Sequence, residues 1–353
     1  MTKYELRQQG VNVSTRRQFL RQLGLGMVAA GATPQILDNA HGTSKPKKKK
    51  QKVKYRILGK TGMKVSEIGF GGHSWSYKRV PDGKGGYRKP TIDEATRMIS
   101  AGLEMGVNFL DSCTPLEESS VPGEALKRLG KRDKVLVSIR VSHKMKGRES
   151  DKKEVYKWTE ERLKLWKTDY VDFCLLCNTA NDTPRSGYWD MSYSMEALDK
   201  LKKQGKIRYT GFGCHFTPEL FLEAFDKFGN YFDTISLPYN IRHRAAEKLL
   251  PEAKKKRLGV ITIKPFARGE LLKNPDLKRS DSGLPRDMIS FVLENKLVDI
   301  CTCGVHTIEQ VRENFSASWT KLSPSGRKRL EKIAATTIAD HQYAWLEHDW
   351  RYA

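Results

Sequence analysis

The fold is decided by the stretch Gly106-Val107-Asn108-Phe109-Leu110-Asp111-Ser112-Cys113-Thr114-Pro115-Leu116-Glu117. Its apolar run, Val107–Leu110, predicts a short buried strand that delivers Asp111 into a polar turn. A (β/α)8 barrel keeps its chemistry in the loops just past the C-terminal ends of its strands. The stretch therefore predicts one barrel strand with an acidic site residue directly behind it.

Apolar runs of strand length alternate with helix-like segments on both sides of this stretch. The predicted strands are residues 67–72, 107–111, 134–141, 170–176, 207–213, 234–238, 259–264 and 298–303. Apolar strands that are each followed by a helix indicate a closed parallel sheet, because such a sheet buries both faces of every strand. We therefore predict an α/β fold, a (β/α)8 TIM barrel over residues 55–320. Residues 321–353 are predicted to form a C-terminal helix and an aromatic tail that pack on the barrel.

The N-terminal residues carry a pattern of their own. Residues Ser14-Thr15-Arg16-Arg17-Gln18-Phe19-Leu20-Arg21 match a twin-arginine export signal, and the mild apolar run 23–32 follows them. We interpret residues 1–42 as this signal, which predicts export through the twin-arginine translocation machinery to the periplasm or beyond. The alternative is a chance pair of arginines before a short amphipathic helix. The apolar run is too short to cross a bilayer, so no stable membrane span is predicted.

Charge is distributed unevenly along the 353 residues. The chain contains 64 Lys and Arg against 41 Asp and Glu, which gives a net charge of +23. Residues 43–54 include Lys47-Lys48-Lys49-Lys50, and such a block predicts a basic, disordered linker. No nucleic-acid-binding module accompanies the other basic residues, so we predict a solvated surface and no nucleic-acid partner. The six cysteines lie in or just after apolar runs, which favours buried free thiols.

Several blocks, in a common order, resemble the aldo/keto reductase superfamily over residues 54–320. The blocks are Leu58-Gly59-Lys60-Thr61-Gly62, Ile68-Gly69-Phe70-Gly71-Gly72, Gly106–Asp111, Thr168-Asp169-Tyr170-Val171-Asp172, Gly205–Phe212, Lys264–Gly269 and Glu309–Asn314. One block alone is weak, and their common order and spacing make the resemblance strong. It implies hydride transfer between a nicotinamide cofactor, NADP or NAD, and a small carbonyl or alcohol substrate.

The resemblance also implies a catalytic set of Asp, Tyr, Lys and His, in which the Tyr donates a proton. This chain matches the Asp, as Asp111, whereas Leu116 stands at the Tyr position, Arg140 at the Lys position and Cys177 at the His position. Leu cannot donate a proton. Arg stays protonated, although it can polarise a carbonyl or pair with a carboxylate. We expect Asp111 and Arg140 to form an ion pair inside the barrel mouth.

Three histidines near predicted strand ends are alternative proton donors: His73, His143 and His215. His215 is the best placed, because members of the family hold the nicotinamide amide near that position. Its other interpretation is a polar cap on the helix that follows. The candidate catalytic residues are therefore Asp111, Arg140 and His215.

The segments that would hold the cofactor match the family more closely. The resemblance implies that one loop wraps the pyrophosphate and a second loop and helix start hold the adenosine. The candidates are Lys264, Phe266, Arg268, Gly269, Gly304, His306, Gln310, Glu313 and Asn314. His306 stands where many members contact the 2′-phosphate, so the choice between NADP and NAD stays open, and Ser236 replaces the family's amide-holding Gln. The alternative is that these blocks are barrel architecture without a cofactor.

Cysteine and histidine side chains also converge on the predicted mouth. They are Cys113, Cys177, Cys214, His73 and His215. Zinc uses such ligands, but these residues lack the local spacing of a zinc motif, and we predict no metal site.

Two functions remain open from the sequence. The first is an exported aldo/keto reductase-like oxidoreductase with a non-standard proton donor and a sugar-like substrate, on which the aromatic tail could stack. The second is a non-redox, ligand-binding or lyase-like pseudoenzyme on the same barrel.

Overall fold

The computed structural model describes residues 51–113, 115–142, 147–177, 190–213, 218–228, 230–272 and 283–335. The predicted export signal and most of the predicted linker lie outside these residues. So do the aromatic tail after residue 335 and the candidate donors His143 and His215.

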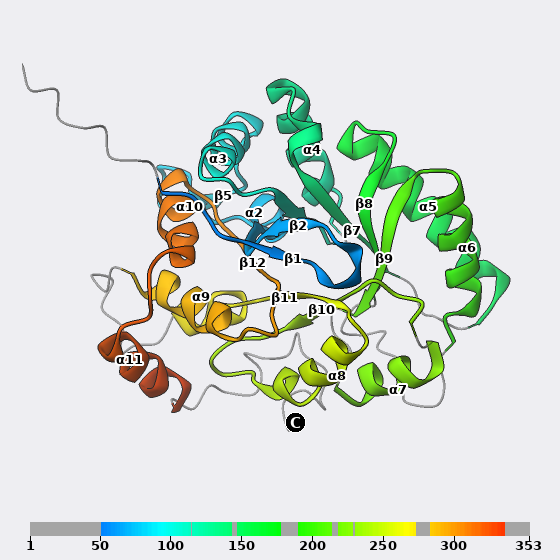
Figure 1. The fold of residues 1–353 in the computed structure, drawn as a ribbon. Coiled ribbons are helices and arrows are strands. Elements are labelled where there is room, and N and C mark those ends of the chain that lie inside the picture. Colours follow the sequence, from blue (N-terminus) through cyan, green and yellow to red (C-terminus); the bar gives the residue numbers. More distant parts are fainter. Residues whose placement is uncertain are drawn as a thin grey trace, which may run out of the picture. The chain divides into compact units, whose positions relative to one another are not determined.

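Within the described residues, eight parallel strands close into a barrel in the order β10-β11-β12-β3-β6-β7-β8-β9 (Figure 1). The strands are β3 (Ile68–Phe70), β6 (Phe109–Asp111), β7 (Leu136–Ser142), β8 (Val171–Cys177), β9 (Ile207–Gly213), β10 (Thr234–Pro238), β11 (Gly259–Ile263) and β12 (Ile300–Cys303). The predicted (β/α)8 barrel is thus confirmed. Burial explains its apolar strands, because all residues of β8, β10, β11 and β12 are buried.

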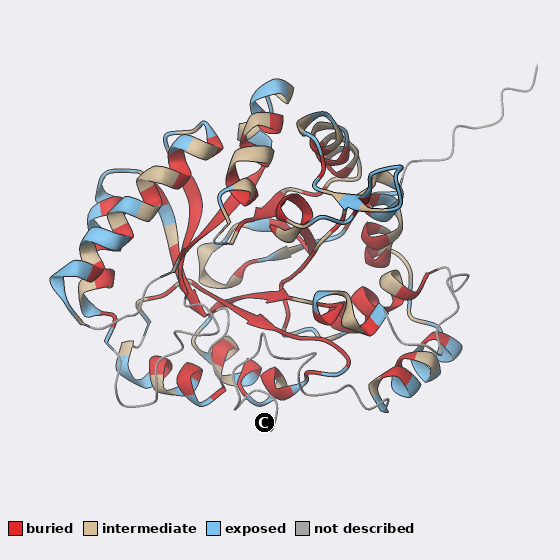
Figure 2. Ribbon diagram, turned by 180° about the vertical axis from the view of Figure 1, so that it is seen from behind, coloured by how far each residue is buried: buried red, intermediate tan, exposed pale blue. Residues whose placement is uncertain are grey.

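The helices lie around the outside of the strands, and their inner faces are buried (Figure 2). They are α3 (Ile92–Glu104), α4 (Glu117–Leu129), α5 (Glu149–Trp166), α6 (Ser192–Lys203), α7 (Pro218–Phe228), α8 (Leu250–Lys255), α9 (Leu284–Glu294), α10 (Ile308–Phe315) and α11 (Pro324–Ala335). A capping box of Thr91 and Glu94 begins α3. None of the described helices is long and apolar enough to cross a membrane.

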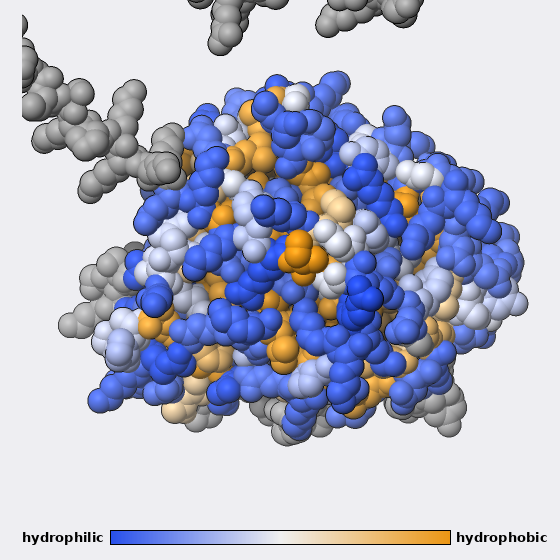
Figure 3. All heavy atoms as spheres, in the orientation of Figure 1, coloured by the Kyte–Doolittle hydropathy of each residue, from blue (hydrophilic) through white to orange (hydrophobic). Residues whose placement is uncertain are grey.

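A hairpin covers the end of the barrel where the strands begin. Its strands, β1 (Tyr55–Ile57) and β2 (Lys64–Ser66), pair antiparallel. Buried Leu58 and Val65 pack there against Phe109 and Phe173, whose rings are 5.9 Å apart. The face seen in Figure 3 is mostly hydrophilic, with small separate hydrophobic areas.

The folded part begins slightly before the predicted end of the linker. Val53 is buried, and its backbone N–H donates to the Met105 carbonyl at 2.9 Å. The N–H of Lys54 donates to the Ser318 hydroxyl at 2.7 Å. The linker prediction therefore needs correcting for these two residues, because an apolar side chain and two backbone bonds attach them to the barrel.

Candidate active site

The first polar cluster in the barrel mouth consists of Asp111, Arg140 and Ser236, and we call it the Asp111 cluster. Asp111 ends β6, Arg140 lies in β7 and Ser236 lies in β10. Arg140 Nη2 donates to Asp111 Oδ2 at 2.5 Å and to Ser236 Oγ at 3.0 Å. The predicted ion pair is confirmed. Since β10 is not a neighbour of β7 in the sheet, Arg140 reaches across the barrel interior.

The Asp111 cluster is closed off from solvent. All three residues are buried. Burial raises the pKa of Asp111, and the Arg140 guanidinium opposes that shift. An arginine is permanently protonated, so this cluster can supply positive charge and hydrogen bonds but cannot cycle a proton through Arg140.

The positions expected to carry the other catalytic groups have different surroundings. Leu116 lies just before α4 and is 48% exposed, and its side chain carries no hydroxyl group. Cys177 ends β8 and is a buried free thiol. The cysteines predicted to be free thiols include buried Cys174 and Cys301, and burial raises the pKa of each to about 12.

A second polar cluster lies beside the first, and we call it the His73 chain: Glu118, His73, Tyr77 and Arg268. It starts at Glu118 in α4, which is fully buried. Its carboxylate accepts from the His73 ring Nδ1 at 2.8 Å, from Ser76 Oγ at 2.7 Å and from the Cys113 N–H at 2.7 Å. Burial alone would raise the pKa of Glu118, but these bonds outweigh it and lower the pKa.

A glycine makes this close approach to Glu118 feasible. A Cβ at Gly72 would lie 2.0 Å from Glu118 Oε2 and 3.1 Å from the Cys113 nitrogen. Any side chain there would displace the carboxylate from its three donors. Glycine at position 72, just after β3, is therefore required by the packing of Glu118.

The exposed half of the His73 chain joins two loops of the mouth. His73 opens the short helix α2 (His73–Ser76), and its ring stacks on Tyr77 with centroids 4.3 Å apart. The Tyr77 hydroxyl lies 3.5 Å from His73 Nε2 and accepts from Arg268 Nη2 at 2.9 Å. Arg268 belongs to the loop after β11, so the chain runs from the loop behind β3 to the loop behind β11.

The loop predicted to wrap a pyrophosphate has an unusual backbone. Lys264, Ala267, Arg268 and Gly269 all have positive φ values, between 45° and 95°. Two backbone N–H groups of this loop donate within it, from Ala267 to the Lys264 carbonyl at 3.0 Å and from Gly269 to the Phe266 carbonyl at 2.7 Å, and they hold its conformation. Arg79 Nη2 lies 4.0 Å from where a side chain at Gly269 would begin, so a second guanidinium flanks the loop.

The second predicted cofactor segment follows β12 and has unused hydrogen-bonding capacity. Gly304 lies opposite Ser74, and the Val305 N–H donates to Ser74 Oγ at 3.0 Å. Among the described residues, His306 Nδ1 and Asn314 Oδ1 are buried side-chain atoms without a hydrogen-bond partner. Burial and the nearby charges of Arg79 and His73 lower the pKa of His306 to about 4. A nucleotide fits these observations, because it brings an anion and hydrogen-bonding groups to a basic, unsatisfied surface.

Three of the predicted cofactor residues make core contacts or hydrogen bonds within the protein itself. Phe266 is buried in the core, and its carbonyl accepts from the Gly269 N–H at 2.7 Å. Gln310 Oε1 accepts from the His306 N–H at 2.7 Å, and Glu313 Oε1 accepts from the Gly283 N–H at 2.8 Å. These residues shape the two loops rather than present a free side chain.

Sequence reasoning missed Tyr77 and Glu118. The only signal for Tyr77 was its position four residues after His73, directly after the short helix that His73 opens. Glu118 stands in an acidic pair beside half-buried Glu117, and nothing in the sequence distinguishes the fully buried acid from its neighbour. In the part of the chain that is described, no group of three or more His, Cys, Asp or Glu could hold a metal ion.

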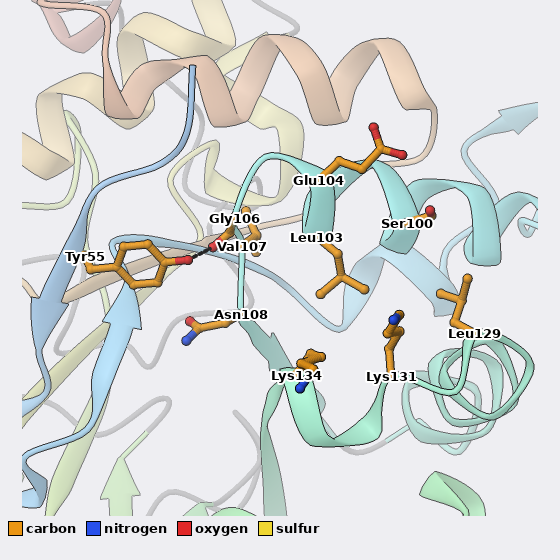
Figure 4. A pocket seen from close by; sticks show the side chains of 10 residues that line it. All are labelled: Tyr55, Ser100, Leu103, Glu104, Gly106, Val107, Asn108, Leu129, Lys131 and Lys134. Atoms are coloured by element: carbon orange, nitrogen blue, oxygen red, sulfur yellow. Dashed lines mark hydrogen bonds between the residues drawn. The ribbon is translucent and has the colours of Figure 1, made fainter. Parts of the chain in front are cut away.

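A surface hollow of about 420 Å3 lies at the other end of the barrel (Figure 4). Its lining includes Tyr55, Asn108, Lys131 and Lys134. Asn108 precedes β6 and Asp111 ends it, so the hollow lies at the strand starts, where barrels carry stability rather than chemistry. No predicted site residue lines it.

Comparison with known proteins gives matches over most of the chain. A family model described as the aldo/keto reductase family matches residues 67–286. An L-galactose dehydrogenase of Arabidopsis thaliana is 26% identical over 326 residues, which cover 83% of this chain and 97% of that protein.

Solved structures share the fold. A holo form of an aldo-keto reductase from Bacillus halodurans superposes with a TM-score of 0.62 at 24% identity, covering 82% of this chain and 99% of that one. An aldo-keto reductase from Klebsiella pneumoniae in complex with NADPH has a TM-score of 0.62 at 21% identity, with coverages of 84% and 99%. At these identities the likeness shows the barrel fold alone.

Proposed function

The chain belongs to the aldo/keto reductase family, and on that premise we propose that it is an NADP-linked oxidoreductase acting on a small carbonyl or alcohol substrate. The observation that carries the proposal is the pair of buried, unpartnered atoms His306 Nδ1 and Asn314 Oδ1. Such atoms are costly to leave unpaired. A nucleotide offers phosphate oxygens to a protonated imidazole and an amino group to an amide oxygen.

The charge around these atoms favours a phosphorylated cofactor. Arg268 belongs to the left-handed loop at Lys264–Gly269, and Arg79 lies beside that loop. Burial and the positive charge of Arg79 help to keep His306 neutral in the free protein. A bound phosphate would remove that repulsion and favour the protonated imidazole, which strengthens the contact.

The Asp111 cluster then faces the reacting end. When bound, the nicotinamide supplies or takes up a hydride. Arg140, held by Asp111 and Ser236 and buried below the mouth, provides a fixed positive charge that acts on a carbonyl through its field and not through a direct contact. It keeps its own protons, so the proton of the reaction has to come from another group.

The substrate class and the location form part of the same proposal. Similarity to L-galactose dehydrogenase over 97% of that protein supports a sugar-like substrate. The twin-arginine pattern at residues 14–21 supports export. Since that pathway carries folded proteins, the cofactor would be bound before export and would cycle in place between two substrates.

The test is to purify the protein from a host that exports it, denature it and identify released nucleotides by mass spectrometry. NADP+ reduction with L-galactose as the probe substrate, and NADPH binding by fluorescence, complete the measurement. We expect NADP in the released material and a loss of NADPH affinity of about tenfold in Asn314→Ala, equivalent to one hydrogen bond to the cofactor. Arg312→Ala, on the exposed side of α10, is the matched control. A protein with no released nucleotide and no NADPH binding would contradict the proposal.

A non-redox function is the second candidate, and the replaced catalytic positions favour it. Leu116 offers no hydroxyl, and Arg140 is committed to Asp111 and Ser236. A lyase-like or ligand-binding barrel would use this charge to hold a small polar ligand. In that case Asp111→Ala would change ligand binding equally with and without NADPH, whereas an oxidoreductase would show a dependence on the cofactor.

A further inference from the structure

We propose that Tyr77 is the proton donor of this enzyme, with His73 and Glu118 as the relay behind it and Arg268 as the cation beside its hydroxyl. The inference rests on the proposed oxidoreductase function and names the group that replaces the missing phenol at Leu116.

The inner end of the relay is a carboxylate with a fixed position. Glu118 is fully buried and accepts three hydrogen bonds, from His73, Ser76 and the Cys113 backbone. A buried carboxylate with this many donors stays ionised. Because it accepts at His73 Nδ1, it holds a proton on that nitrogen and leaves Nε2 to face outward.

The outer end of the relay combines a hydroxyl with two partners. Stacking on His73 places the Tyr77 ring so that its hydroxyl lies 3.5 Å from Nε2, the outer limit of a hydrogen bond. Arg268 donates to the same oxygen at 2.9 Å. Since Arg268 can only donate, the hydroxyl proton of Tyr77 must point elsewhere, to Nε2 or to a substrate.

The location of Tyr77 suits a reaction at the cofactor. It is half-buried, and it follows β3 while its partner Arg268 belongs to the predicted pyrophosphate loop. Ser74, the neighbour of His73 in α2, accepts from the Val305 N–H of the loop after β12 at 3.0 Å, and Glu118 accepts from the N–H of Cys113, two residues after Asp111. The His73 chain therefore lies between the predicted cofactor segments and the Asp111 cluster.

Another tyrosine that follows a barrel strand already has a hydrogen-bond acceptor. Tyr239 follows β10, is buried, and donates its hydroxyl proton to Glu247 at 2.6 Å. Burial and that carboxylate raise its pKa to about 12. Tyr239 is thus held as a structural hydrogen-bond donor, which Tyr77 is not.

The proton balance of a reduction can be written through these groups. As a hydride reaches the carbonyl carbon, the O–H bond of Tyr77 breaks and its proton goes to the carbonyl oxygen, giving the alcohol. Nε2 of the neutral His73 ring takes a proton from solvent and passes it to the phenolate of Tyr77, which Arg268 stabilises meanwhile. His73 then returns to its neutral form, and its Nδ1 proton stays hydrogen-bonded to the Glu118 carboxylate throughout. In alcohol oxidation the same steps run in reverse.

The first test compares Tyr77→Phe with Tyr87→Phe, an exposed tyrosine of the short strand β5 (Tyr87–Arg88), in the full-length protein. Removing a general acid should lower kcat by about 100-fold or more. NADPH affinity, measured by fluorescence without substrate, should change less than about twofold, because in this proposal Tyr77 makes no contact with the cofactor. Tyr87→Phe should match the wild type in both.

The outcomes separate the inference from the function on which it rests. Failure of the wild type to bind NADPH overturns the proposed function, and the inference with it. Binding of NADPH together with an unchanged kcat in Tyr77→Phe overturns the inference alone. NADPH binding without hydride transfer to or from any sugar in an aldose panel also overturns it, because the donor would have no reaction to serve.

A second test does not need turnover. Nitrogen NMR of ring-labelled histidine should find His73 with a proton on Nδ1, and Glu118→Gln should abolish that preference while Ser76→Ala preserves it. A neutral His73 ring protonated at Nε2 alone would overturn the relay, since Nε2 could not then accept from Tyr77.

Discussion

The two polar clusters of the mouth have similar components and opposite accessibility. Both pair a buried carboxylate with a cationic or ionisable partner. In the Asp111 cluster the partner is a buried arginine, and its hydrogen bonds extend no further than Ser236, inside the barrel. In the His73 chain the partner is a histidine whose side chain is 33% exposed, and the bonds continue outward to Tyr77 and Arg268.

This difference determines what each cluster can do. A buried arginine–carboxylate pair holds a static charge, because neither group has a route to exchange protons with solvent. A carboxylate–histidine–tyrosine chain connects a buried base to the surface through groups that can lose and regain protons. Substitution of the expected Tyr, Lys and His thus closed one site while a neighbouring one stayed open to proton transfer.

The largest expected effect comes from breaking the Asp111 cluster. Asp111→Ala leaves Arg140 without its counter-charge in the barrel interior, and this should lower the free energy of unfolding by about 3–5 kcal/mol. Urea denaturation followed by circular dichroism measures it. Asp133→Ala, in an exposed pair with Lys134, is the control and should leave the curve unchanged. A small effect of Asp111→Ala would mean that water reaches the cluster, and the contrast between the two regions would disappear.

A loss of stability of intermediate size is expected when the pH is lowered, because of His306. The pKa of His306 is lowered to about 4 in the folded protein. Between that pH and the ordinary pKa of histidine, the ring gains a proton only when the protein unfolds. This contribution to stability is present above about pH 6.5 and is lost as the pH falls towards 4, about 2 kcal/mol between pH 7 and pH 5. Unfolding curves of wild type and His306→Gln at both pH values measure it.

His243 provides the control for that experiment, since burial also lowers its pKa to about 4. His243→Gln should reduce the acid sensitivity in the same way but leave NADP affinity unchanged, whereas His306→Gln should weaken NADP binding. Equal NADP affinity in both variants would argue against His306 as a cofactor contact.

The smallest effect on stability is expected at Arg268. A substitution there should lower the reaction rate without changing stability, in contrast to the loss of stability expected at Asp111. Arg268→Met removes the exposed donor to Tyr77 and should leave the unfolding curve unchanged. The rate of hydride transfer should fall by about tenfold, because one hydrogen bond to the developing phenolate is lost. Arg268→Lys should recover part of the rate. A variant that unfolds more easily but turns over normally would assign Arg268 to the structure instead of the reaction.

Much of the mouth could be predicted from sequence because neighbours on parallel strands are brought together by the barrel itself. Asp111 and Arg140 end up paired since β6 and β7 are adjacent and both residues lie towards the strand ends. The predicted cofactor segments follow β11 and β12 for the same reason. His215 stays a prediction, as it lies outside the described residues.

The His73 chain could not be predicted in this way. Its members come from α2, α4 and two loops, and their contacts depend on how far each side chain reaches and which face of α4 is buried. Glu117 and Glu118 are identical in type and adjacent in sequence, yet Glu117 reaches the exposed Lys89 and Glu118 the interior. Helix rotation, set by packing against the barrel, made that choice.

The sequence by itself determined the eight-stranded barrel, the loss of a phenol at Leu116 and the pairing of Asp111 with Arg140. Those features depend on hydrophobic periodicity, residue chemistry and strand order, which are all local or topological. Only the tertiary structure decided that Arg140 is buried and reaches Ser236 across the barrel interior, and that Tyr77 lies between His73 and Arg268. Burial and side-chain reach are properties of the packed molecule, and they select which polar residues stay available for chemistry.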